Sequence, residues 1–361
     1  MKVLRYDLRD VFLAAGLGLR LRKWFVTLPA AALGIVWWAV FGYLALLAQG
    51  MPVDLIWKTY GPVPWPFLRT MNHPLSILIW IVGFAGGVII WMLASVAVGR
   101  ITYKQLKGND FYGWSEAWSF AFRKWKAAIL PWLFFSVSAG IVVGVLLAIS
   151  QLIGLWTPFV AFLFPIVVVG TIVLLYIAMV GMQSVIMGPS IVAASSSETL
   201  ESLFELFSLH AGQGKRCWLY SVVSGLVALA YTAALGVFLA VAVLLGAWIM
   251  DMGHAGLAGR TIRSAAGLAP RLWSGINGVP GIIDSLVHQI GPVGTKVPMP
   301  YPGSMPPVTV TTVLAGVAIT IMLFFLKAQF VATFATCQTT SYLTLRWLKD
   351  EQNLLEEDFE D

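Results

Sequence analysis

The sequence predicts an all-α membrane protein with six transmembrane helices. Of its 361 residues, 59% are apolar and only 11% are charged, and the mean hydropathy is +0.83. This composition lies outside the range of soluble proteins. Six apolar runs are also long enough to cross the hydrocarbon layer, which takes about 20 residues of helix with every backbone amide satisfied internally.

The six predicted spans differ in length. The fourth and fifth exceed what the bilayer requires, so each is expected to tilt, to kink at proline or to project from the membrane. The mixed polar and apolar run 328–345 leaves open whether the sixth helix ends near residue 326 or continues. The predicted spans are 28–48, 75–98, 127–149, 156–191, 219–250 and 308–326.

The distribution of basic residues predicts the orientation. Seventeen of the 23 Lys and Arg residues fall on one side of the predicted spans, which is the side of both termini. The positive-inside rule therefore predicts a multi-pass protein of the inner (cytoplasmic) membrane with both termini in the cytoplasm. The formal net charge of +6 is explained by this topology, so nucleic acid is not an expected partner.

An amphipathic stretch precedes the first, third and fifth spans. In each, apolar residues stand at i, i+3, i+4 and i+7, which places them on one face of a helix. The chain is thus predicted to contain three tandem units, 1–107, 108–197 and 198–361, each an amphipathic cytoplasmic helix followed by a helical hairpin. The three apolar faces are Leu8, Val11, Phe12 and Ala15; Trp118, Ala121, Phe122 and Trp125; and Leu200, Leu203, Phe204 and Phe207.

Each amphipathic stretch ends in a basic and aromatic cluster. Cations are expected to stay in the headgroup layer while an indole ring sits at the interface, which fixes the depth of the following span. The predicted interfacial anchors are Arg22, Lys23 and Trp24; Arg123, Lys124 and Trp125; and Lys215, Arg216 and Trp218.

The sequence offers little for catalysis or ion coupling. The cores of the first five predicted spans hold no Asp, Glu, Lys, Arg or His, and only Lys327, at the end of the sixth, is a possible intramembrane charge. Neither the two cysteines nor the four histidines have metal-ligand spacing, so no catalytic residue, metal or cofactor is predicted, and structural lipids are expected to bind. The histidines are His73, His210, His254 and His288.

Two polar segments lie outside the spans. The stretch 251–307 is rich in Gly and Pro, which suits either an outer docking surface or a solvated linker. The acidic stretch 350–361 would be disordered alone, so a neighbouring surface is expected to hold it, either basic residues of this chain or another subunit. Its predicted docking residues are Glu356, Glu357, Asp358, Glu360 and Asp361.

Two cytoplasmic segments carry a resemblance to known proteins. The segments "VGRITYKQLKGND…WSEAWSFAFRKWKAAILPW" and "VIMGPSIVAASSSETLESLFELFSLHAGQGKRCWLYSVVSGLVALAY" resemble uncharacterised six-span bacterial integral membrane proteins of planctomycete type. These families stand near the glycerophosphodiester phosphodiesterase membrane domain and the Yip-type proteins. The resemblance implies a membrane-embedded accessory module and supplies no catalytic residue.

The sequence therefore favours a non-enzymatic membrane subunit or scaffold that binds lipids and other membrane protein subunits. The alternative is a transporter or channel for a neutral or lipid-like solute, because internal repeats are common in transporters. A lipid-modifying enzyme would need an interfacial cluster of carboxylates or histidines. Asp110 and Glu116 are close in sequence, but they are interpreted as residues of a helix start.

Overall fold

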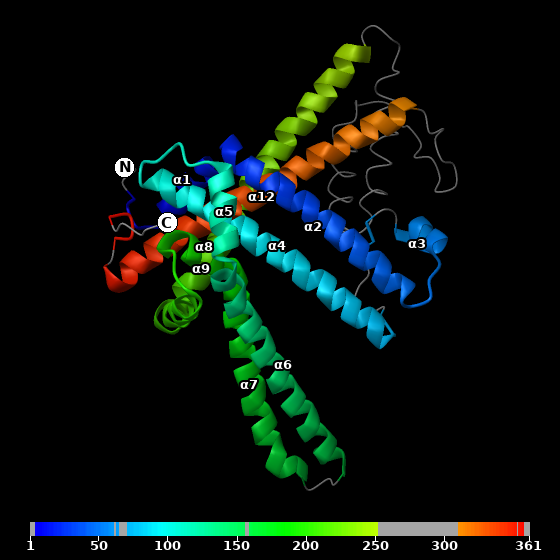
Figure 1. Ribbon diagram of the computed structural model, residues 1–361, viewed down its shortest axis with the longest axis vertical. Helices are drawn as coiled ribbons and strands as arrows, with labels where there is room; N and C mark the ends of the chain where they lie inside the picture. Colours follow the sequence, from blue (N-terminus) through cyan, green and yellow to red (C-terminus); the bar gives the residue numbers. More distant parts are fainter. Residues whose placement is uncertain are drawn as a thin grey trace, which may run out of the picture. The chain divides into compact units, whose positions relative to one another are not determined.

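A computed structural model describes residues 4–60, 63–64, 71–155, 159–251, 310–351 and 353–356. Throughout this part of the chain, every regular element is an α-helix (Figure 1). Six of the described helices are long and apolar enough to cross a membrane. The predicted all-α membrane fold is confirmed. The predicted outer segment 251–307 lies outside the described residues beyond Asp251.

The described helices range in length from 8 to 53 residues. They are α1 (Arg9–Gly18), α2 (Leu21–Leu47), α3 (Val53–Tyr60), α4 (Pro74–Leu106), α5 (Trp114–Arg123), α6 (Trp125–Leu155), α7 (Phe159–Ile186), α8 (Gly188–Ser195), α9 (Thr199–Asp251) and α12 (Val310–Asp350).

Two compact units make up the chain, and their boundaries fall within helices. Unit 1 comprises Met1–Ala30, Val88–Thr232 and Ala328–Asp361, and unit 2 comprises Ala31–Gly87 and Ala233–Lys327. A separate helix precedes the first and the third spans, and the amphipathic stretch before the fifth span forms the first part of α9. The division into three tandem units stays a prediction.

Several helices continue beyond their predicted ends. The helix α2 begins at Leu21, α4 runs on to Leu106, and α12 reaches Asp350 instead of ending near residue 326. Hydropathy predicts where a helix leaves the apolar layer, but the helix itself continues until its backbone hydrogen bonding stops. The alternative of a longer sixth helix is therefore the correct one, and it places Lys327 inside α12 and not at its end.

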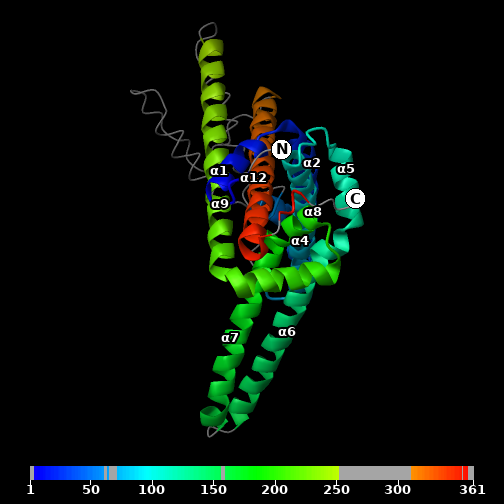
Figure 2. The ribbon, with the colours of Figure 1, turned by 90° about the vertical axis from the view of Figure 1, so that its left-hand side faces the viewer.

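The overlong fourth span is divided, and the fifth helix is bent. The helix α7 ends at Ile186 and α8 starts at Gly188, where Pro189 cannot donate a backbone hydrogen bond. In α9 the non-helical Gln213, with φ −137° and ψ 33°, separates the amphipathic part from the apolar part, and Figure 2 shows the bend.

Unit 2 contains a helix that the hydropathy pattern did not reveal. The short amphipathic α3 inserts Ile56 into a small core with Ala45, Leu46 and Met71. In the same unit α2 and α4 approach closely, since the indole of Trp37 donates to the carbonyl of Gly83 at 3.1 Å. Glycine allows this approach because it has no side chain to hold the helices apart.

Candidate functional site: a buried polar core along α12

The second half of α12 carries a dense run of buried polar side chains in unit 1. Their hydroxyls remain compatible with a helix because several bond the carbonyl one turn back, as Thr336 does to Ala332 at 2.7 Å and Thr339 to Ala335 at 2.9 Å. The buried polar residues are Gln329, Thr333, Thr336, Gln338, Thr339, Thr340, Ser341 and Thr344.

Lys23 enters this polar core from the first turn of α2. Its side chain is fully buried, and its ammonium group donates to the hydroxyl of Thr336 at 3.0 Å. The hydroxyl of Thr102 on α4 lies 3.4 Å from the same Thr336 oxygen. The prediction that Lys23 is a headgroup anchor is thus wrong, because α2 begins early enough to turn this residue toward α12.

Arg100 on α4 is the second fully buried cation. Its guanidinium donates to the carbonyl of Ala193 on α8 at 3.0 Å and lies over the ring of Phe120, 4.3 Å from the centroid. It also hydrogen-bonds Tyr112, between α4 and α5; burial raises the pKa of the Tyr112 hydroxyl, and the Arg100 charge opposes that rise. Lys23 and Arg100 lie outside the predicted spans 28–48 and 75–98, which contain no Lys or Arg, yet both are buried inside the longer helices α2 and α4.

Small residues bring the backbones of these helices together. A Cβ on Gly18 of α1 would lie only 2.7 Å from the Cα of Thr333. One on Gly99 of α4 would lie 2.8 Å from both the Ala193 Cβ and the Thr339 hydroxyl. Small residues therefore stand where α1, α4 and α8 approach the polar run of α12. The short distances between these helices allow their polar groups to form hydrogen bonds.

A second part of the polar core joins α7, α9 and α12. The hydroxyl of Ser221 donates to the Gln183 amide oxygen at 3.3 Å, and the Gln338 amide nitrogen donates to the Ser221 carbonyl at 3.5 Å. Ser224 and Ser341 share a hydrogen bond of 3.1 Å. These contacts tie three helices from distant parts of the chain through uncharged groups.

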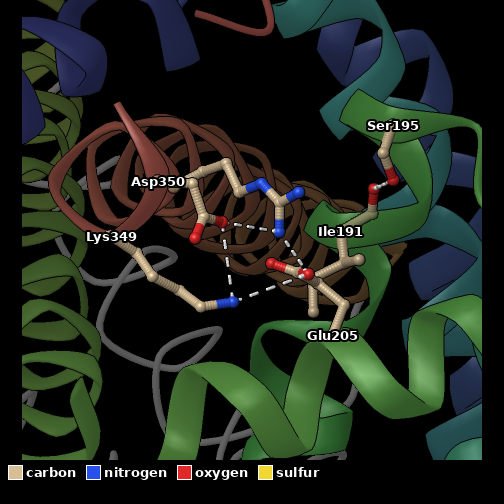
Figure 3. A network of polar contacts seen from close by, with 6 residues as sticks. Ile191, Ser195, Glu205, Lys349 and Asp350 are labelled. Carbon is tan, nitrogen blue, oxygen red and sulfur yellow. Dashed lines mark hydrogen bonds and ion pairs between the residues drawn. The ribbon is translucent and has the colours of Figure 1, made fainter. Parts of the chain in front are cut away.

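An ion-pair cluster joins the end of α12 to the amphipathic part of α9. Glu205 pairs with Arg346, and Figure 3 shows Lys349 close to both Glu205 and Asp350. Asp350 lies 3.1 Å from the Arg346 guanidinium, one turn away on the same helix. All four side chains are at most 35% exposed, so the pairs are screened less than surface pairs.

The segment that follows α12 packs against unit 1 through apolar side chains. Leu354 and Leu355 are buried in a core cluster with Tyr103, whose hydroxyl donates to the Leu354 carbonyl at 2.9 Å. The Tyr6 hydroxyl donates to Asn353 at 2.7 Å, and its ring stacks on Trp347. Within the described residues, this segment is therefore held by leucines and tyrosines, a signal that the acidic composition concealed.

The predicted docking carboxylates of this segment are only partly described. Glu356 is exposed and accepts a hydrogen bond from the Asn353 amide at 2.7 Å. Glu357, Asp358, Glu360 and Asp361 lie outside the described residues. Two basic residues of this chain that could have held the segment have other partners: Arg20 pairs with Asp110 at 2.6 Å and Lys124 with Glu198 at 2.7 Å.

The other predicted anchors are spread over unit 1. Arg22 contacts the Asp110 carbonyl and lies over the Phe111 ring, and Trp24 is half-buried. Arg123 and Trp125 are exposed at the junction of α5 and α6. On α9 the third set lies just beyond the bend, with Lys215 and Arg216 exposed and Trp218 half-buried.

The chemistry that the described residues bring together is hydrogen bonding and ion pairing. Within the ranges that the structure describes, no three potential metal-ligating side chains cluster. His254 and His288 lie outside those ranges. Asp110 and Glu116 serve local contacts, since Asp110 pairs with Arg20 and Glu116 accepts from the Gly113 amide at 3.2 Å at the start of α5.

Comparison with known proteins adds no relative to this description. No family model, no curated protein and no solved structure matches the chain. What can be concluded about its function therefore depends on the helices and contacts described above: the chain is a multi-pass membrane protein whose spans contact lipid.

Proposed function

We propose that this chain is a non-catalytic accessory subunit or scaffold of the bacterial inner membrane, with both termini in the cytoplasm. The polar core along α12 holds neighbouring helices together through hydrogen bonds. The apolar surfaces of the spans are then available to bind other membrane proteins. The resemblance to uncharacterised six-span membrane proteins, seen in the cytoplasmic segments, agrees with an accessory role.

The observation that carries this proposal is the α6–α7 hairpin. The two helices pack along one another (Figures 1 and 2), yet only 6% of the most apolar window of either one is buried. Exposed side chains such as Val137, Ile141 and Ile172 form apolar surface along both helices. Surface of this kind can contact either lipid or another apolar helix, so the hairpin is suited to adhesion inside the bilayer.

The polar core supports the proposal by explaining how such a hairpin is positioned. Its buried groups bond to each other across helices, as Lys23 does to Thr336 and Ser224 to Ser341. Interhelical hydrogen bonds of this type contribute about 0.6 kcal/mol each on average in membrane proteins. A core with many of them gives a fixed base, which a positioning subunit requires.

Photocrosslinking in native membranes tests the proposal. A photoreactive residue at Ile141 of α6 or Ile172 of α7 is expected to give discrete protein adducts on denaturing gels. Leu13 of α1 is the matched control, because it is similarly exposed (67%, against 63% and 60%) and lies outside the spans. Lipid adducts alone at Ile141 and Ile172, or the same protein adducts at Leu13, would refute docking through the hairpin.

A transporter or channel for a neutral or lipid-like solute is the second candidate, and the polar core favours it. Buried hydroxyls and amides along one helix can line a route for a polar solute. Flux of small uncharged solutes into liposomes should then fall when Thr336→Val and Thr340→Val are combined. Flux that is equal in empty liposomes and in those holding the wild-type protein would exclude this candidate.

The acidic segment after α12 has a separate role in the proposal. Leu354 and Leu355 belong to the chain's own core, so only the residues after them are proposed to dock a partner. Removal of residues 357–361 should weaken partner retention at low salt and leave the melting temperature unchanged. Leu354→Ala should lower the melting temperature as well. If partner retention does not change when residues 357–361 are removed, the segment does not dock a partner.

A further inference from the structure

The helix α5 and the start of α6 present an aromatic surface that the scaffold proposal does not use. We define the α5 aromatic ridge as Trp114, Trp118, Phe122 and Trp125. The first three are spaced by four residues and so lie along one face of α5, and the Trp118 and Phe122 rings stack with centroids 5.3 Å apart. Trp114, Phe122 and Trp125 are exposed.

The ridge borders the face by which α5 packs on the rest of unit 1, because Trp118 is half-buried against that core while the other three ridge residues are exposed. That packing face consists of Ala117, Phe120 and Ala121, which are all buried. A third face is polar and carries Ser115, Glu116 and Ser119, all exposed. A helix with one face on protein, one aromatic and one polar is typical of an element that lies in the membrane interface.

The ridge continues into the apolar surface of a membrane span. Trp125 is the first residue of α6, and the exposed side chains that follow it include Leu130 and Phe134. The surface of α6 contacts lipid because α6 is a span. Continuity with that surface identifies lipid, and not water or a soluble protein, as the occupant of the ridge.

Cations at the rim of the ridge indicate the charge of that lipid. Arg123 and Lys126 are both exposed, and Lys126 lies over the Trp125 ring, 5.9 Å from its centroid. Lys124, by contrast, is committed to Glu198 at 2.7 Å. Two exposed cations therefore stand beside aromatic rings at the end of a span, while Glu116 on the polar face is bound to the start of its own helix.

We propose that the α5 aromatic ridge lies in the headgroup layer and that Arg123 and Lys126 bind the phosphate groups of anionic phospholipids there. The rings occupy the boundary between headgroups and acyl chains, where aromatic side chains are enriched. The cations meet the phosphates at the rim, as basic side chains of interfacial helices do. The ridge and its two cations lie outside the parts of α6 and α7, around Ile141 and Ile172, on which the scaffold proposal rests.

Native mass spectrometry of the purified full chain tests the charge preference. The protein is incubated with equal amounts of phosphatidylglycerol and phosphatidylcholine. Wild type should retain phosphatidylglycerol preferentially, and the double variant R123Q/K126Q should bind it roughly fivefold more weakly for each cation removed. The control R5Q/R9Q removes two other exposed cations and should behave as wild type. Equal binding of the two lipids by wild type, or equal losses in both variants, would overturn the proposal.

Cysteine labelling tests the placement of the ridge. Phe122→Cys is compared with Ser119→Cys on the polar face of the same helix, with a water-soluble maleimide on chain reconstituted in phosphatidylglycerol vesicles. The native Cys217 and Cys337 are buried and give a low background. The proposal expects Cys at 122 to be shielded and Cys at 119 to react. Equal reaction of both, or shielding of 122 only in native membranes that hold other proteins, would overturn it.

Discussion

The polar core along α12 and the α6–α7 hairpin are two regions of unit 1 built on opposite plans. In α12, 44% of the most apolar window is buried and its mean hydropathy is 1.4. In α6 and α7 only 6% of the corresponding window is buried, with hydropathies of 2.4 and 2.7. The more polar helix is the more buried one, which inverts the rule for soluble proteins.

This difference indicates which interactions determine the packing of each region. Apolar side chains gain little by moving from lipid into a protein interior, so α6 and α7 can keep theirs on the surface. A buried hydroxyl or ammonium group needs a partner in either place, and the polar run of α12 finds partners on α2, α4, α8 and α9. Polar contacts therefore determine which helices meet, and apolar surface determines what else can bind.

The largest expected effect is the loss of a buried cation from the polar core. Arg100→Met removes the donor to the Ala193 carbonyl and the cation over Phe120, and we expect it to lower the free energy of unfolding by about 3 kcal/mol. Lys126→Met removes an exposed cation of α6 as the control and should change it by less than about 0.5 kcal/mol. Denaturant titration in detergent measures both. Equal effects would erase the distinction between the two regions.

A pair of glycine substitutions compares the regions directly. Gly18→Ala places a Cβ against the Thr333 backbone and should cost about 1–3 kcal/mol through overpacking. Gly140→Ala adds a methyl group in open space on α6 and should be neutral or stabilise by up to about 1 kcal/mol through helix propensity. Thermal unfolding of both variants in the same detergent is the measurement. The same sign for both would contradict the proposed difference in packing.

The ion-pair cluster at the end of α12 should contribute a smaller amount. Glu205→Gln removes the carboxylate that faces Arg346 and Lys349, and its partial burial sets the expected cost at about 1–2 kcal/mol. Glu201→Gln, on an exposed neighbour in α9, is the control. Urea titration at low and at high salt should show a loss that persists at high salt. A loss that disappears there would mean that the cluster behaves as a surface pair.

The smallest expected effect belongs to the exposed pair of Lys124 and Glu198. The hydrogen bond from Lys124, and its positive charge, lower the pKa of the Glu198 carboxyl in the folded protein. The pair therefore adds stability above the ordinary pKa of a glutamate and loses it as the pH falls through the lowered value. The melting temperatures of wild type and Glu198→Gln should differ slightly at pH 7 and converge in acid. A difference that grows in acid would reverse the sign.

Much of the fold could be predicted because the hydropathy of a segment shows directly whether that segment prefers lipid or water. Each predicted span overlaps a helix, and the helices that precede three of them were expected from the spacing of apolar residues. The short α3 was missed because its eight residues are too few for a span, although Val53, Ile56, Trp57 and Tyr60 have the i, i+3, i+4, i+7 spacing of an amphipathic helix. The continuation of α12 was left open, because the run 328–345 mixes polar with apolar residues and its many threonines are weak helix formers.

The candidate site was largely missed, and particular residues show why. Lys23 follows Arg22 in a basic and aromatic cluster that also suits an interfacial anchor, yet one is buried and the other half-buried. Adjacent residues on a helix point about 100° apart, so a difference of one position decides whether a cation meets water or a neighbouring helix. Leu354 and Leu355 were likewise concealed by the carboxylates around them.

The sequence by itself determined that the chain is an all-α membrane protein, where most of its spans begin, and which side its basic residues favour. These properties depend on transfer between water and lipid, which each segment undergoes separately. Only the tertiary structure decided that Lys23 joins the hydroxyls of α12 in one polar core, that Arg100 is buried against α8, and that α6 and α7 remain exposed. Such assignments depend on which helices become neighbours, and that is a property of the whole chain.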